Sequence, residues 1–296
     1  MTSHRDLQGT TQSRLPAIVL QSRDDVQRDT ECSRTQQPRP PLGTPLRLCV
    51  GPTVVVRAVA KRLAADLPEW GFVLPDLRHH GESHDLPGPD TLRACVADLD
   101  TLAADLGVAP RTAIGHSFGG KIAYVWGEVH EARGEPVDRV WALDVPPGLP
   151  VGPAAESSEV LQVVRTLREL PQPLPRRDSI VTELTARGFS HATALWMTTN
   201  LRPADGGYVW RFNLDGVEAL LRDYAVTDCW PWLLSLGRRA RVDVVQAGRD
   251  PRWTPEELGR FAGVQRLNLH RLETGHWVHV EDPEGLNRLL VGEGLG

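Results

Sequence analysis

The sequence of 296 residues lacks the patterns that mark metal sites, membrane spans and nucleic-acid-binding surfaces. Its four cysteines (Cys32, Cys49, Cys95 and Cys229) are scattered and form no C-x-x-C pair, so we expect no metal site. No apolar run approaches the length of a membrane-spanning helix. The net charge is −5, and the sequence contains no long run of charges of one sign. Both observations argue against nucleic acid as a partner.

The first dozen residues are polar and contain no apolar segment of the kind that a secretory signal peptide needs. The cysteines show no spacing typical of a disulfide framework. We therefore expect a cytoplasmic protein with free thiols.

Residues 1–45 are poorly patterned. Residues 15–20 are apolar enough for a strand, whereas residues 21–44 are polar, then rich in proline, and show neither strand nor helix periodicity. Three interpretations stay open: degenerate edge strands, a disordered segment, or an aberrant start or reading frame of the coding sequence. Comparison with the coding DNA in all frames distinguishes the last from the other two.

From residue 46 onwards, short apolar runs alternate with helical patterns. This alternation predicts an α/β fold, with a mostly parallel sheet and helices on both of its faces. Thr254, Pro255 and Glu257 form a capping box that marks one helix start, and Asp90 is the expected N-cap of another. Strands are expected over residues 46–50, 71–75, 111–114, 137–145, 241–246 and 264–270, and helices over residues 54–67 and 91–106, after residue 120, and from residues 254 and 283.

The alternation stops between residues 146 and 236, where helical segments occur without a clear buried strand. We predict a helical cap inserted into a core formed by residues 46–145 and 237–296. The cap is rich in large side chains, which would either line an apolar pocket or hold the cap to the core. They are Trp196, Met197, Trp210, Phe212, Trp230 and Trp232.

The chemistry centres on the stretch Gly115-His116-Ser117-Phe118-Gly119-Gly120, which follows an apolar strand and opens a helix. In such a nucleophile elbow, small flanking residues let strand and helix pass closely, and a strained turn exposes the serine. Ser117 is the expected nucleophile. Because a serine hydroxyl is weakly nucleophilic at neutral pH, it needs a histidine oriented by a carboxylate.

His276 is the expected base, since it follows the last strand in a Gly-His turn. Two aspartates compete as the acid. Asp250 follows the strand expected over residues 241–246, where enzymes with a nucleophile elbow usually carry the acid, and we prefer it. Asp144 follows the strand after the elbow and is the alternative.

The transition state of acyl transfer also needs two N–H donors for its oxyanion. Phe118 is expected to supply one. The second normally comes from the turn after the central strand, here Gly51-Pro52-Thr53. Because Pro52 has no N–H group, Gly51 or Thr53 remains as the donor.

Four motifs stand out in the sequence: D-x-R-x-H-G-x-S (residues 76–83), G-H-S-x-G-G-K (residues 115–121), W-R-F-N (residues 210–213) and the Asp at the start of residues 144–147. Together they make the chain resemble, over roughly residues 50–292, a branch of small single-domain esterases in the α/β-hydrolase superfamily. That branch often has serine at the position of Asp250, and the counterpart of Asp144 is proposed there as a functional acid.

The resemblance implies a serine hydrolase that cleaves carboxylic esters, with thioesters as a further option, through an acyl-enzyme and without a cofactor. Its partner would be a small-molecule ester. The altered oxyanion turn and the unpatterned first residues motivate one alternative: an impaired or non-catalytic protein of the same fold that binds a small apolar ligand or a protein partner.

Overall fold

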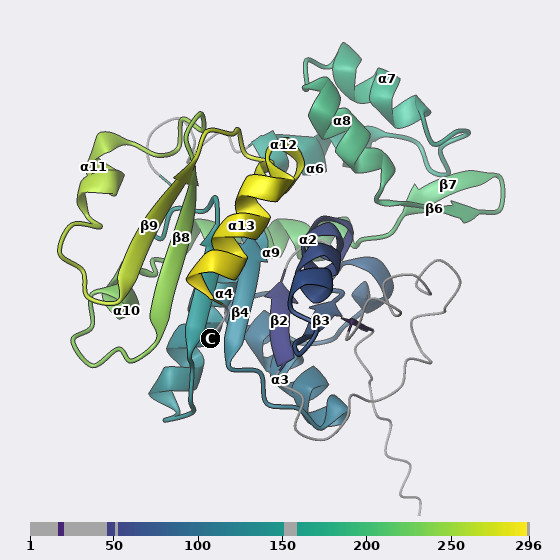
Figure 1. Cartoon of the computed structure of the whole chain (residues 1–296). Coiled ribbons are helices and arrows are strands. Elements are labelled where there is room, and N and C mark those ends of the chain that lie inside the picture. Colours follow the sequence, from purple (N-terminus) through teal and green to yellow (C-terminus); the bar gives the residue numbers. More distant parts are fainter. Residues whose placement is uncertain (1–16, 21–45, 51–52, 151–158, 295–296) are drawn as a thin grey trace, which may run out of the picture.

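A seven-stranded sheet forms the centre of the molecule (Figure 1). The structure, a computed structural model, describes residues 17–20, 46–50, 53–150 and 159–294. The strand order is β1-β3-β2-β4-β5-β8-β9, and every neighbouring pair is parallel except β1 with β3. The strands are β1 (Ala17–Leu20), β2 (Leu46–Val50), β3 (Gly71–Pro75), β4 (Thr112–His116), β5 (Arg139–Leu143), β8 (Arg241–Ala247) and β9 (Leu267–Leu272).

Helices cover both faces of this sheet, as the alternating sequence pattern predicts. Successive strand residues point to opposite faces: Val140 belongs to one apolar cluster and Trp141 to the other. In Figure 1, α2 and α13 lie in front of the sheet, and α3 and α4 lie behind it. The bounds are α2 (Thr53–Asp66), α3 (Leu92–Leu106), α4 (Phe118–Ala132) and α13 (Pro283–Glu293).

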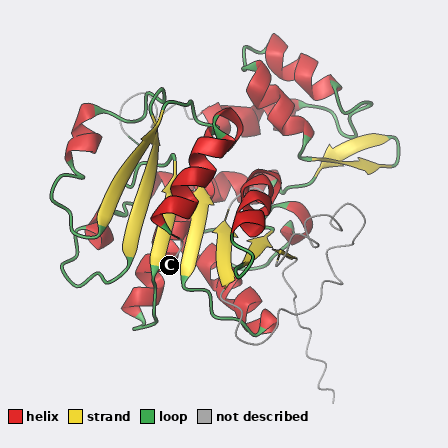
Figure 2. Ribbon diagram, in the orientation of Figure 1, coloured by secondary structure: helices red, strands yellow, loops and turns green. Residues whose placement is uncertain are grey.

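Between β5 and β8 the chain leaves the sheet and forms the elements of the predicted cap (Figure 2). Several of them share a hydrophobic cluster of their own, in which Ile180, Leu184 and Met197 are buried. The elements are α6 (Glu159–Glu169), α7 (Ser179–Ala186), α8 (His191–Thr198), β6 (Leu201–Ala204), β7 (Gly207–Trp210), α9 (Leu214–Val226) and α10 (Trp230–Leu233).

The expectation that this stretch contains helices alone was wrong, because β6 and β7 pair as an antiparallel hairpin. Its turn is Asp205-Gly206, and Gly206 has φ +81°. An Asp-Gly pair between residues that favour strands is a strong local hairpin signal, so the sequence did contain the information.

Two further boundary expectations need correction, and one is confirmed. Thr91, not Asp90, caps α3: its hydroxyl accepts a hydrogen bond from Ala94 N at 3.1 Å. The predicted start of α11 (Pro255–Gly259) is confirmed, with the N-cap Thr254 accepting from Glu257 N at 3.1 Å, whereas Thr254 N donates to Arg252 O and so does not complete the capping box. β9 begins three residues later than expected. In the first segment, β1 lies within the stretch predicted as a strand; residues 21–45 lie outside the described residues.

Candidate active site

Ser117 lies between β4 and α4 in a backbone conformation that few non-glycine residues adopt, with φ 52° and ψ −117°. The glycines around it are required by close approach. A Cβ on Gly115 would lie 2.1 Å from Gly119 O, and one on Gly120 would lie 2.4 Å from Val145 Cγ1. The local geometry is therefore that of a strained strand-to-helix turn, as the spacing of the motif predicts.

His276 and Asp144 come together from the ends of two different strands. His276 follows β9 and is 31% exposed, whereas Asp144 follows β5 and is fully buried. The Nδ1 atom of His276 lies 2.7 Å from Oδ2 of Asp144. The other oxygen of Asp144 accepts hydrogen bonds from Ala247 N at 2.9 Å and from Trp253 Nε1 at 2.6 Å. These bonds hold the carboxylate in one orientation toward the imidazole.

Asp250 lies near the same histidine but is engaged elsewhere. Its Oδ2 atom is 3.7 Å from His276 Nδ1. Its carboxylate accepts hydrogen bonds from Arg252, from the backbone N at 2.9 Å, from Nε at 3.0 Å and from Nη2 at 2.7 Å. Burial alone would raise the pKa of Asp250, but the hydrogen bonds and charge of Arg252 outweigh it and lower this pKa to about 2.

Arg252 is the site residue that sequence reasoning missed. Its Nη2 atom lies 2.7 Å from each of three atoms: Oδ2 of Asp144, Oδ2 of Asp250 and Nδ1 of His276. These three residues form the kind of cluster that can hold a metal ion. Here the guanidinium group supplies the positive charge at their centre. The only sequence signal is a basic residue two positions after Asp250, which is a common surface arrangement.

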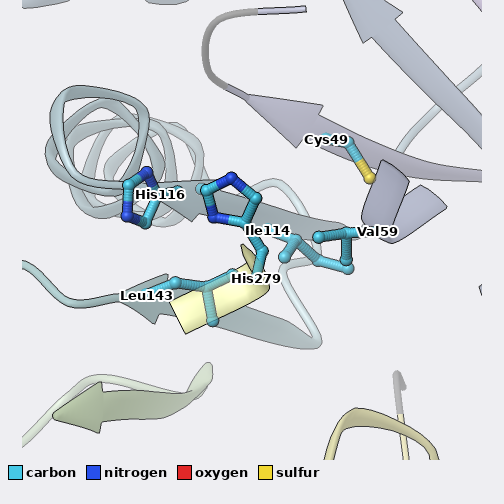
Figure 3. A pocket seen from close by; sticks show the side chains of 7 residues that line it. Cys49, Val59, Ile114, His116, Leu143 and His279 are labelled. Atoms are coloured by element: carbon cyan, nitrogen blue, oxygen red, sulfur yellow. The ribbon is translucent and has the colours of Figure 1, made fainter. Parts of the chain in front are cut away.

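His116 packs against His276 with its ring tilted, and it contacts His279 edge-on (Figure 3 shows His116 and His279). The ring centroid of His116 is 4.7 Å from that of His276 and 5.0 Å from that of His279, and His116 Nε2 donates to His276 O at 2.8 Å. Burial, with the neighbouring histidines, holds the pKa of His116 well below its ordinary value. Burial, then the charge of His276, lowers the pKa of His279 to about 4. Both rings are therefore neutral near pH 7.

His116, His279 and Cys49 border a cavity of about 10 Å³ that Val59, Ile114 and Leu143 also line (Figure 3). A space of this size holds about one water molecule. His116 thus packs beside the elbow, and His279 lies in the short helix α12 (Val278–Glu281).

Of the three predicted oxyanion donors, two lie among the described residues. Phe118 is the first residue of α4, and Thr53 is the first residue of α2. The first N–H groups of a helix have no partner within it, so both positions can present a donor. Gly51 lies outside the described residues.

The W-R-F-N motif is where the predicted cap contacts the core. Phe212 forms an isolated antiparallel bridge with His80, and Asn213 N donates to His79 O at 3.0 Å. Arg211 Nη2 lies 3.6 Å from Glu82 Oε1. At Gly216, an added Cβ would lie 2.3 Å from the His79 ring, so the start of α9 packs directly on His79, within the D-x-R-x-H-G-x-S motif.

Two cations of the sequence motifs have structural partners. Arg78 binds Asp98 through Nε at 2.9 Å and Nη2 at 2.8 Å. Lys121 is fully buried and donates from Nζ to Pro147 O at 2.9 Å and to Gly148 O at 2.6 Å. It therefore anchors the segment that follows Asp144, and burial lowers its pKa.

Residues 48–289 match the alpha/beta hydrolase family, which covers most of the chain. The chain belongs to this family. Mouse sn-1-specific diacylglycerol lipase ABHD11 is 29% identical over 226 residues, which are 71% of this chain and 66% of that protein. The chain thus spans just under two thirds of the mouse protein's length.

Other relatives carry different names. Lipase LipV of Mycobacterium tuberculosis is 37% identical over 110 residues, 37% of this chain and 38% of that one. The magnesium-chelatase 30 kDa subunit of Rhodobacter capsulatus is 27% identical over 228 residues, which are 75% of this chain and 76% of that protein. Among solved structures, a marine microorganism esterase aligns with a TM-score of 0.71 at 19% identity, over 93% of this chain and 98% of that one. The structural likeness concerns the fold.

None of the described helices has the length and apolar character needed to cross a bilayer.

Proposed function

We propose that this alpha/beta hydrolase is a serine hydrolase that cleaves carboxylic esters through an acyl-enzyme. One observation carries the proposal: a buried aspartate is hydrogen-bonded to a histidine whose ring packs against the neighbour of an elbow serine. Asp144 Oδ2 lies 2.7 Å from His276 Nδ1, and the ring of His116, next to Ser117, packs against His276. A Ser-His-Asp set in this chain order and at these strand ends is typical of ester hydrolysis on this fold.

The chemistry proceeds in two halves. Ser117 Oγ attacks the acyl carbon while His276 Nε2 takes its proton, and the tetrahedral oxyanion then expels the alkoxide, which receives that proton from His276. The acyl group is now an ester of Ser117. His276 next removes a proton from water as the water attacks the acyl carbon. Collapse of the second oxyanion releases the carboxylic acid and returns the proton to Ser117.

We assign the orienting role to Asp144, although the sequence alone favours Asp250. The distances support this choice, at 2.7 Å from His276 Nδ1 for Asp144 and 3.7 Å for Asp250. When Nδ1–H donates to Asp144, Nε2 is left without a proton and can act as the base. Asp250 already has Arg252 as its partner.

The oxyanion donors of the proposal are the Phe118 N–H and either Thr53 or Gly51. Removal of one such donor typically costs about 10²- to 10³-fold in rate. Since Ser117, His276 and Asp144 supply nucleophile, base and orienting group, the proposed reaction needs no cofactor. Thioesters react by the same steps, with a thiolate in place of the alkoxide.

The mouse and mycobacterial relatives are named lipases, so we propose acyl esters as the substrate class. Aromatic side chains adjoin the elbow. The ring of Phe118 stacks on that of Tyr224 with centroids 6.0 Å apart, and its centroid lies 6.5 Å from that of His80. Such surfaces favour an apolar acyl group. A chain-length series of p-nitrophenyl esters would measure how long that group is.

Labelling with a fluorophosphonate tests the proposal, because this reagent forms a covalent bond with an activated serine. We expect rapid labelling of the full chain and none of the Ser117→Ala variant. Ser235→Ala removes an exposed serine of the loop before β8 and serves as the matched control, with labelling unchanged. Folded wild-type protein that resists the reagent would contradict the proposal and favour a protein that binds a ligand or partner without catalysis.

A further inference from the structure

Arg252 is placed in the middle of the proposed catalytic groups, and the catalytic steps above do not use it. Its Nη2 atom is 2.7 Å from Asp144, Asp250 and His276, and it also lies 3.1 Å from Asp144 O. The side chain is 30% exposed, while Asp144 and Asp250 are 0% and 6% exposed. An arginine in this position changes both the hydrogen bonding and the charge around the base.

The number of hydrogens on Arg252 Nη2 determines which group His276 Nδ1 is hydrogen-bonded to. The Nη2 atom carries two hydrogens, and two carboxylate oxygens compete with one neutral nitrogen for them. Charge-assisted bonds to carboxylates are about twice as strong as neutral ones. Both hydrogens therefore go to Asp144 and Asp250, and Nδ1 of His276 keeps its own proton as a donor to Asp144. If Arg252 instead donated to Nδ1, Nε2 would carry the proton and could not accept one from Ser117.

The charges lead to the same conclusion. Two carboxylates beside one imidazole would favour the imidazolium and hold the base in its charged, inactive form at neutral pH. Arg252 cancels one of these two negative charges. The remaining net charge equals that of a single aspartate, as in an ordinary Ser-His-Asp set.

We propose that Arg252 is a positioning residue: it neutralises Asp250, so that His276 faces the net charge of one carboxylate, and it leaves Nδ1 free to donate to Asp144. This inference rests on the proposed function. Asp250 and Arg252 then form one unit, in which each residue is tolerated at the site because the other is present.

The other titratable groups around His276 do not disturb this balance near neutral pH. His116, at the end of β4, and His279, in α12, have lowered pKa values because they are buried and face other histidines. Tyr224, from α9, faces Arg252, and burial raises its pKa. All three are uncharged, so the charged groups of this cluster beside His276 Nδ1 are Asp144, Asp250 and Arg252.

The test is an NMR titration of ¹³C-labelled histidines in the full chain, with the His276 signal assigned through a His276→Asn variant. We expect Arg252→Met to move the His276 titration midpoint up by about one pH unit, and Asp250→Asn to move it down by about one unit. The double variant Asp250→Asn/Arg252→Met restores a single carboxylate and returns the midpoint to the wild-type value. Arg252→Lys keeps the charge and the wild-type midpoint.

Arg249→Met is the matched control, because Arg249 lies in the same loop, is 61% exposed and pairs with Glu281. It leaves the midpoint unchanged. Midpoints that are equal in all variants, or that move in the same direction in both single variants, would overturn the proposal. If Arg252→Met does not fold, Asp250→Asn decides alone, since an unchanged or higher midpoint contradicts the charge balance.

The titration needs no turnover, so it is separate from the labelling of Ser117. Failure to label with the expected midpoints would refute the proposed function and leave the charge balance standing. Normal labelling with unchanged midpoints would refute only the role of Arg252.

Discussion

Two buried aspartates lie toward opposite ends of the sheet, and each contacts an arginine and a histidine: Asp144 follows the carboxyl end of β5, and Asp243 lies near the start of the neighbouring strand β8. Asp243 Oδ2 lies 2.6 Å from Arg139 Nε, and its Oδ1 lies 2.8 Å from His270 Nε2. Both carboxylates are fully buried. By composition alone the two clusters would be equal candidates for a catalytic site.

Their surroundings separate them. His270 stacks on Trp141 with ring centroids 5.5 Å apart, and Asn268 also donates to Asp243 at 2.8 Å. Arg139 reaches the carbonyl of Glu293 at the end of α13. The Asp243 cluster therefore joins a helix to the sheet, and among the described residues no strained serine turn adjoins it. At the carboxyl ends of the parallel strands, by contrast, the connecting loops bring His116, the neighbour of Ser117, against the ring of His276. This end of the sheet is where α/β proteins bind their ligands.

The largest effect that separates the clusters is expected on reactivity. Asp144→Asn should slow fluorophosphonate labelling by about 10³- to 10⁴-fold, because the imidazole loses the carboxylate that fixes its tautomer. Asp250→Asn should slow it by about tenfold or less, since the bond to Asp144 survives. Labelling rates at one pH near 8 measure both. Equal losses in the two variants would return Asp250 to the role of acid.

Asp243→Asn should act on stability and leave reactivity intact. It removes the carboxylate that pairs with buried Arg139, and breaking a buried pair costs about 3–5 kcal/mol. Urea unfolding measures this loss, and labelling of the remaining folded protein at the wild-type rate is the expected companion result. A variant with wild-type stability and slow labelling would remove the distinction between the two clusters.

The smallest effect is a dependence of stability on acid pH. Hydrogen bonds from His270, Arg139 and Asn268 outweigh burial, which alone would raise the pKa, and lower the pKa of Asp243 to about 2. An unfolded chain binds the same proton near pH 4. This carboxylate therefore stabilises the fold fully above about pH 5, and that contribution, about 2–3 kcal/mol, disappears as the pH falls toward 2.

Unfolding free energies measured from pH 6 to pH 2.5 check this slope, with Asp243→Asn as the control that should flatten it. A variant whose acid slope equals that of the wild-type protein would show that other groups cause the loss.

The sequence predicted much of this molecule because its signals are local. Alternating apolar runs require two covered sheet faces, and the spacing around Ser117 is required by close packing at Gly115 and Gly120. The hairpin of β6 and β7 also has a local signal, Asp205-Gly206, which lies between two segments with helical patterns.

The choice between two acids was not local. Asp144 and Asp250 follow neighbouring strands, so their distances from His276 depend on how the loop after β8 turns. That turn is set by Arg252, whose backbone N–H and side chain both bind Asp250. No pattern of spacing reveals that an arginine side chain folds back into a cluster of acids, and only three-dimensional placement shows it.

The backbone of Asp144 has φ 49°, in the left-handed region. Among residues with a side chain, asparagine and aspartate enter this region most readily, because their short polar groups tolerate it. Only one of these two carries a carboxylate. If Asp144 has the orienting role that we propose, its identity is constrained twice, once by the conformation of the chain and once by the need for a negative charge. A glutamate here would keep the charge, but its longer side chain is less readily accommodated in this conformation, so aspartate meets both demands best.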